Sequence, residues 1–241
     1  MNHRFKLIFF LLFLPGLLLA QNSIDFDQYF LDKTMRIDYF HVGDAKEEFI
    51  TLDRIFDQGI WAGSKRRLVD YFNNGRYYIK IYDLASGKLI FSRGFDSYFG
   101  EYKTAGDALK GIKRTYHESA LIPYPKKKIR FVLEVRDRQN LLKLLFSQEI
   151  DPFGTDINRE PLGTGVRVFE IQKSGDPHEK IDIAFIAEGY TAKEEEKLKE
   201  DLERFTQVFF KQEPYATYKD KFNIYGVFKP SEESGCDEPS H

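Results

Sequence analysis

The residues able to hold a metal ion or to act as nucleophiles are few and far apart in the sequence. The chain has five histidines, His3, His41, His117, His178 and His241. A zinc peptidase normally presents two histidines one helical turn apart, with a glutamate base between them. No two histidines here have that spacing, and no His-Glu-x-x-His occurs. We therefore assign no catalytic residue, no metal ligand and no cofactor within this chain.

A polar loop near the C-terminus holds the only local group with ligand chemistry. Cys236, Asp237 and His241 stand close together there and could ligate a metal. The chain has a single cysteine and no second cluster, which favours a solvated loop instead. The serines of the loop have no candidate base nearby, and no GxSxG, P-loop or GxGxxG pattern occurs. An enzyme built on the Ser231–His241 loop is the least favoured interpretation.

The elements that would position a site in the second half are two strands joined by a helix. The apolar runs Val166–Ile171, Ile181–Ala187 and Phe222–Phe228 are predicted as strands, with a helix between the last two. Strand, helix, strand is a βαβ unit, whose strands run in parallel. One such unit cannot cover both faces of a parallel sheet. We therefore expect this domain to be incomplete at His241; the alternative is a minimal domain packed on the first half.

The helix itself has clear signals at both ends. Thr191 followed by Glu194 three residues later is a capping box. The helix is expected to run to about Lys211, and Pro214 lies beyond its end. One face is predicted to pack on the strands and carries the apolar residues Leu198, Leu202, Phe205, Val208 and Phe209.

The carboxyl ends of the two parallel strands carry the candidate cleft residues, because ligands bind outside these ends in open parallel sheets. Glu188, Gly189 and Tyr190 follow the first strand, and the loop after the second carries Glu233 and Asp237. The glycine lets the backbone turn sharply into the helix. The tyrosine would present a ring and a hydroxyl at the cleft edge. The acidic loop would bind a structural cation or basic peptide segments; the alternative is that it is simply solvated.

The first half is predicted to be a β-sandwich, because short strands alternate with close turns. An Asn-Asn-Gly turn at 73–75 predicts a hairpin between two of these runs, and Ser86-Gly87 marks the next turn. The predicted strands are Arg67–Phe72, Tyr77–Tyr82, Lys88–Arg93, Ile129–Val135 and Leu141–Ser147.

The first twenty residues have the layout of a secretory signal. Basic residues at positions 3, 4 and 6 precede the apolar run Leu7–Leu14, and Ala20 ends the segment before Gln21. A membrane anchor is the alternative, because a spanning helix needs about 20 apolar residues. A Pro-Gly pair late in the run favours cleavage. We therefore expect an exported protein that is periplasmic, at the cell surface or secreted.

Composition and turn residues complete the predicted layout. Residues 1–20 are a signal peptide, 21–152 a sandwich domain, 153–165 a Gly- and Pro-rich linker, and 166–241 the start of an α/β domain. The chain has 36 basic and 38 acidic residues, a balance that favours neither nucleic acid nor a membrane surface as partner. Its one cysteine excludes an intrachain disulfide.

The second half resembles the opening of a known catalytic domain. The string IDIAFIAEGYT, a helix, and then EPYATYKDKFNIYGVFKPSEESGCDEP resemble the IgA-peptidase family of zinc metallopeptidases. Upstream, RRLVDYFNNGRYYIKIYDLASGKLIFSRGFDSYFGEY resembles the sandwich-like domain that precedes the peptidase domain in Bacteroidetes members. This resemblance implies zinc and a protein or peptide substrate for the complete enzyme. The family's zinc motif lies further downstream, so the resemblance places none of its ligands on this chain.

Two interpretations of the function therefore stay open. In the first, the chain is the N-terminal portion of a secreted zinc endopeptidase, inactive alone, whose sandwich positions or recognises protein substrate. In the second, it is an exported non-catalytic binding module that has lost its peptidase half. A His-Glu-x-x-His encoded beyond the codon for His241 would separate the two.

Overall fold

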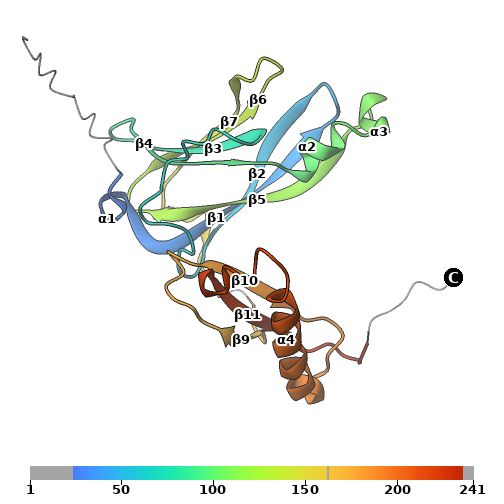
Figure 1. Cartoon of the computed structure of the whole chain (residues 1–241). Helices are drawn as coiled ribbons and strands as arrows, with labels where there is room; N and C mark the ends of the chain where they lie inside the picture. The colour runs from blue at the N-terminus through green and yellow to red at the C-terminus, as the bar shows by residue number, and fades with distance from the viewer. Residues whose placement is uncertain (1–23, 162, 236–241) are drawn as a thin grey trace, which may run out of the picture.

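Three β-sheets make up most of the molecule in this computed structural model, which describes residues 24–161 and 163–235 (Figure 1). The predicted signal peptide lies outside the described residues. The first sheet has the strand order β5-β1-β2-β8. Its strands are β1 (Phe30–Gly43), β2 (Glu48–Asp57), β5 (Arg114–Pro125) and β8 (Ile157–Asn158).

The second sheet has the order β4-β3-β6-β7 and faces the first (Figure 1). Its strands are β3 (Tyr77–Asp83), β4 (Leu89–Phe95), β6 (Ile129–Arg136) and β7 (Leu142–Ile150). One apolar core lies between the two sheets. Met35 and Ile37 from β1, Ile81 from β3, Ile122 from β5 and Phe131 from β6 are wholly buried in it. Burying each such side chain contributes about 1.5–3 kcal/mol, and the N-terminal part is sandwich-like, as predicted.

Short helices accompany the strands of the sandwich. The helices α2 (Tyr98–Tyr102) and α3 (Gly106–Leu109) connect β4 to β5, and α1 (Phe26–Tyr29) precedes β1. A small apolar cluster of Phe99, Tyr102 and Ala108 anchors the α2–α3 segment. This cluster brings the start of α2 over the ends of β1 and β5.

The hairpin predicted around residues 73–75 is wrong, because Arg67–Phe72 forms no strand. Strand β3 pairs antiparallel with β4 on one side and with β6 on the other. The β3–β4 hairpin turns at the predicted Ser86-Gly87, where Gly87 has a φ of 69°. That left-handed conformation suits glycine, which has no Cβ.

Asp70 gives the physical reason that the Arg67–Phe72 segment is irregular. Its carboxylate accepts hydrogen bonds from the Tyr78 hydroxyl at 2.6 Å and from the backbone N of Phe72 at 2.9 Å. Such local side-chain bonds compete with a strand ladder. The segment is held against the edge strand β4 by the backbone N of Ser92, which donates to Leu68 O at 2.9 Å.

The third sheet, with the order β10-β11-β9, confirms the predicted strand–helix–strand unit. Its elements are β9 (Arg167–Gln172), β10 (Ile181–Ile186), α4 (Glu195–Phe209) and β11 (Phe222–Phe228), with 3₁₀ turns at Ala192–Glu194 and Lys219–Lys221. Strands β10 and β11 run in parallel, with Ile183 opposite Ile224, and β9 pairs antiparallel with β11. Helix α4 covers one face of this sheet.

The apolar face predicted for this helix is only partly correct. Leu198 and Leu202 are buried against the sheet, and Thr206 continues their line. In contrast, Phe205 and Val208 are 47% and 48% exposed. Leu198, Leu202 and Thr206 are four residues apart and therefore lie in one row along the helix. The three-stranded sheet covers this row, whereas the neighbouring row with Phe205 and Val208 stays in solvent.

The predicted linker 153–165 is partly tied to the sandwich. Strand β8 pairs in parallel with β2 through Ile55 and Ile157, and Ile157 lies in the sandwich core. The Arg159 guanidinium donates to the backbone oxygens of Pro152 and Gly154 at 2.9 and 3.1 Å. The position of the domain boundary itself stays a prediction.

Candidate functional site

The carboxyl ends of β10 and β11 lie at the same edge of the third sheet, where the sequence placed a cleft. Gly189 has a φ of 75° and turns the chain out of β10. Its backbone N donates to Ser231 Oγ at 3.1 Å, and its oxygen accepts from the backbone N of Gly235 at 2.8 Å. The backbone N of Ser231 donates to Tyr190 O at 2.8 Å. The two predicted loops are therefore joined directly.

Tyr190 has a different environment from the one expected. Its hydroxyl donates to Asp201 Oδ2 on helix α4 at 2.9 Å, and its half-buried ring packs beside Leu198 and Leu202. Burial and the hydrogen bond to the Asp201 carboxylate raise the pKa of Tyr190. The hydroxyl is thus paired within the domain, and its place at a cleft edge stays a prediction.

Glu194 connects the helix start to the acidic loop, a role that sequence reasoning missed. Glu194 Oε2 accepts from the backbone N and the hydroxyl of Thr191, both at 2.9 Å, which confirms the capping box. Its Oε1 accepts from the Ser234 hydroxyl at 2.8 Å. The backbone N of Thr191, with the Ser234 and Thr191 hydroxyls, lowers the pKa of Glu194 to about 2. The capping box was visible in the sequence, but its contact with a loop 40 residues away was not.

The remaining candidate residues form an acidic rim. Glu188 and Glu233 are both exposed, and within residues 163–235 neither takes part in an ion pair. Asp237 lies outside the described residues. The role of these carboxylates at a cleft stays a prediction.

A second polar centre lies inside the sandwich and was not found from the sequence. His41 on β1 is 1% exposed. Its Nδ1 lies 3.1 Å from Glu118 Oε2, and its Nε2 lies 3.2 Å from Glu48 Oε2. The Phe99 ring stacks on the imidazole with a centroid distance of 3.9 Å. Because these residues come from three strands and a short helix, no local sequence pattern indicates the cluster.

The hydrogen bonds of this cluster shift the pKa values of Glu48 and His41. Lys103 Nζ donates to Glu48 Oε1 at 2.6 Å, and the Tyr77 hydroxyl donates to Glu48 Oε2 at 3.0 Å. Burial raises the pKa of Glu48, but the bonds from His41 and Lys103 outweigh it and lower the pKa to about 2. Burial likewise opposes charge on His41, yet its bonds to Glu118 and Glu48 raise its pKa. The cluster thus holds the His41 imidazole between two carboxylates, which favour its charged form.

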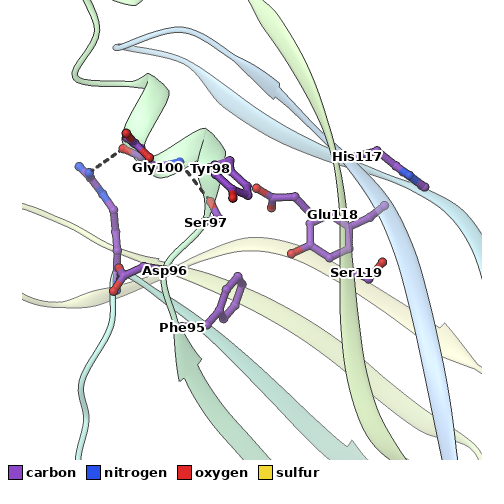
Figure 2. Close-up of a pocket in the computed structure, with 11 residues that line it drawn as sticks. Phe95, Asp96, Ser97, Tyr98, Gly100, His117, Glu118 and Ser119 are labelled. Carbon is purple, nitrogen blue, oxygen red and sulfur yellow. Dashed lines mark hydrogen bonds between the residues drawn. The ribbon is translucent and has the colours of Figure 1, made fainter. Parts of the chain in front are cut away.

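A cavity of about 700 Å³ opens beside this cluster. Figure 2 shows Tyr98 and Ser97 at the start of α2 facing Glu118 on β5, with Phe95 and Asp96 on the adjacent wall. Glu118 is the one member of the cluster that lines the cavity, and its Oε1 already accepts from the backbone N of Phe99 at 3.3 Å. His41 does not line the cavity, and Glu118 joins the cavity wall to the cluster.

Comparison with known families shows which family the chain belongs to. Residues 25–147 match the family described as Peptidase M64 N-terminus, and residues 169–241 match IgA Peptidase M64. The chain belongs to the IgA-peptidase family. The two matches follow the order that the sequence resemblance implied; the first covers most of the sandwich and the second most of the third sheet. Among curated proteins, none matches the chain.

The IgA-peptidase family is a metallopeptidase family, which implies zinc. Across residues 24–161 and 163–235, no group of three or more His, Cys, Asp or Glu side chains is arranged to hold a metal ion. Cys236, Asp237 and His241 lie outside the described residues. The described residues therefore do not fit a zinc centre, and no chemical step is assigned to them. Nor does any helix in this part of the chain have the length and apolar character to cross a membrane.

Proposed function

We propose that this chain is the N-terminal portion of an exported zinc metalloendopeptidase that acts on protein substrates. The observation that carries the proposal is the tandem match to the two IgA-peptidase family regions. The parallel β10–β11 pair supports it, because the ends of such strands are where open sheets bind their ligands. In this proposal the third sheet begins an α/β metallopeptidase-like domain.

The two parts of the chain would then have different roles. The sandwich would recognise or position protein substrate, and the edge of the third sheet would form one wall of the peptidase cleft. Glu188 and Glu233 would give that wall its negative charge and favour basic peptide segments. Zinc would supply a Lewis acid and an activated water in the complete enzyme. Since this chain carries no His-Glu-x-x-His, we infer that it does not hydrolyse peptides by itself.

Export is the second component of the proposal and rests on the charge and hydropathy pattern of residues 1–20. The mature protein would start at Gln21. An intact-mass measurement on secreted material tests this point. Retention of residues 1–20 in a membrane fraction would instead identify them as an anchor.

An exported binding module without peptidase activity is the second candidate. It is favoured by the lack of a metal-binding cluster in the described residues and by the two large cavities of the sandwich. Reading the coding DNA past the codon for His241 separates the candidates. An in-frame His-Glu-x-x-His supports the endopeptidase, whereas its absence in every frame supports the binding module.

A further inference from the structure

A cavity of about 720 Å³ lies between the loop Trp61–Phe72 and the edge strand β4 of the sandwich. It shares no lining residue with the cavity in Figure 2. Its floor is apolar, because Leu68 and Phe91 are buried and the Trp61 ring meets Phe91 edge to face at 5.8 Å. No part of the proposed cleft contributes to it.

The Trp61 side chain carries an unpaired hydrogen-bond donor in this cavity wall. Trp61 is 6% exposed, and its Nε1 is buried without an acceptor among the described residues. An indole N–H can only donate, and leaving it unpaired in the interior is costly. Gly63, which also lines the cavity, lies so close to the indole that a Cβ there would be 3.0 Å from Nε1. The indole N–H is thus an unsatisfied donor covered by Gly63 in the wall of the cavity.

Positive charge surrounds the apolar floor. Arg66, Arg67 and Arg93 all line the cavity. Among the described residues no carboxylate lies within ion-pair distance of Arg67 or Arg93, and the Arg66–Glu179 pair is long, at 3.7 Å, and exposed. The one acidic group in the lining, Asp70, already accepts three hydrogen bonds within the protein. In a chain of formal net charge −2, this is a locally cationic surface.

Exposed aromatic side chains lie at the rim of the cavity. Tyr71 and Phe72 are 67% and 81% exposed, and both line the cavity. Exposed aromatic side chains at a concave site commonly anchor a partner. An apolar floor and guanidinium groups together match a peptide with carboxylates beside an apolar side chain.

We propose that this cavity binds a peptide segment in which acidic residues flank an aliphatic or aromatic side chain. The apolar side chain occupies the floor beside the Trp61 ring, and the carboxylates pair with Arg67 and Arg93. This inference rests on the proposed function, in which the sandwich recognises protein substrate, and it assigns that recognition to one site and one class of sequence.

The same loop also touches the part of the chain that precedes β10. Gly63 O lies 3.1 Å from His178 Nδ1, and His178 Nε2 lies 3.2 Å from Asp32 Oδ2 on the sandwich. Arg66 reaches Glu179 across the same junction. A peptide held in the cavity therefore lies next to the junction with the third sheet, at the amino end of β10, whereas the proposed cleft lies at the carboxyl end of that strand.

Trp61 is the only tryptophan of the chain, so its fluorescence reports on this cavity directly. The experiment titrates residues 21–241 with the blocked peptide Glu-Leu-Glu-Phe-Glu, with its glutamine analogue, and with sialyllactose as an anionic sugar. The proposal predicts a saturable change with the acidic peptide and at least tenfold weaker binding of the glutamine analogue. Equal binding of the two peptides, no saturable change, or binding of the sugar alone would overturn it.

Variants locate the contact. Arg67→Gln and Arg93→Gln should each weaken acidic-peptide binding about tenfold, because each removes a charge-assisted hydrogen bond, while Arg54→Gln on β2 leaves the Kd unchanged. Trp61→Phe, followed by anisotropy of a labelled peptide, should weaken binding several-fold. Unchanged Kd values for the cavity variants, at unchanged thermal stability, would contradict the assignment. None of these measurements requires hydrolysis, so their outcome is independent of the peptidase proposal.

Discussion

The imidazole of His41 is held between two carboxylates, and its Nδ1 lies 3.1 Å from Glu118 Oε2 although 77 residues separate them in sequence. His41, Glu48 and Glu118 stand on β1, β2 and β5, so the cluster ties three strands of one sheet at its buried face. Removing the imidazole leaves two carboxylates buried without their shared partner, which costs far more than a surface ion pair.

We therefore predict that His41→Gln lowers the free energy of unfolding by about 3 kcal/mol at pH 6. The matched control is His117→Gln, whose side chain is 49% exposed and pairs with Asp53 at the surface; it should change stability by at most about 0.5 kcal/mol. Denaturant unfolding of both variants measures the difference. Equal effects of the two substitutions would show that the cluster does not stabilise the fold.

The pH dependence of stability follows from the same groups. The pKa of His41 is raised above 6.5, so its contribution is complete below pH 6.5 and is lost as the pH rises through the raised value. The pKa of Glu48 is lowered from 4.5 to about 2, so its contribution is complete above pH 4.5 and is lost as the pH falls toward 2. Stability should be greatest between these limits, and the deficit of His41→Gln should shrink at high pH. A deficit that grows with pH would contradict the raised pKa of His41.

Glu194→Gln should loosen the loop that carries Glu233. The Glu194 carboxylate accepts hydrogen bonds from Thr191 and Ser234 and so joins the helix start to the acidic loop. The substitution weakens this acceptor. Hydrogen exchange of residues 231–235 should become faster and the melting temperature should fall. Glu200→Gln, on the exposed face of the same helix, is the control. If both variants exchange alike in this loop, the contact between Glu194 and Ser234 has no energetic role.

The acidic rim predicts a substrate preference. In the complete enzyme, Glu233→Gln should reduce kcat/KM for peptides with Arg or Lys near the scissile bond several-fold, with little change for neutral peptides, because an exposed charge acts mainly by steering. Raising the salt concentration should reduce the difference in kcat/KM between the parent enzyme and the variant for basic peptides. Equal turnover of basic peptides by parent and variant would place the cleft on another face of the sheet.

The two-part layout predicts where proteases cut first. Exposed connections without secondary structure are the preferred sites of nicking, so brief subtilisin digestion should yield fragments that end within residues 153–165. Because residues up to Arg159 are bonded to the sandwich, cuts after this arginine should predominate. First cuts inside β3, at Tyr77–Asp83, would argue against two separately stable parts.

Local patterns in the sequence predicted the third sheet well. The capping box at Thr191 could be predicted because its residues are close together in the sequence. The parallel strand pair could be predicted because two strands joined by a helix run in parallel. The hairpin at 73–75 failed, since Asp70 binds Tyr78 and the local backbone and so replaces a strand ladder. The His41 cluster could not be foreseen, because its members become neighbours only through pairing of β1 with β2 and β5. Gly189 turns the chain out of β10, and the Tyr190 hydroxyl donates to Asp201, a contact that the sequence did not indicate; the assignment of both residues to a cleft edge stays a prediction.

The most direct test of the central claim is zinc content and peptide hydrolysis, measured for residues 21–241 alone and for the same chain extended by a downstream segment that carries His-Glu-x-x-His. We predict no stoichiometric zinc and no hydrolysis for the chain alone, and both for the extended protein, with hydrolysis abolished by a chelator. Stoichiometric zinc in residues 21–241 that is lost on Cys236→Ser or His241→Ala, or an extended protein that binds zinc without hydrolysing any peptide, would contradict the assignment of this chain to the N-terminal portion of a zinc endopeptidase.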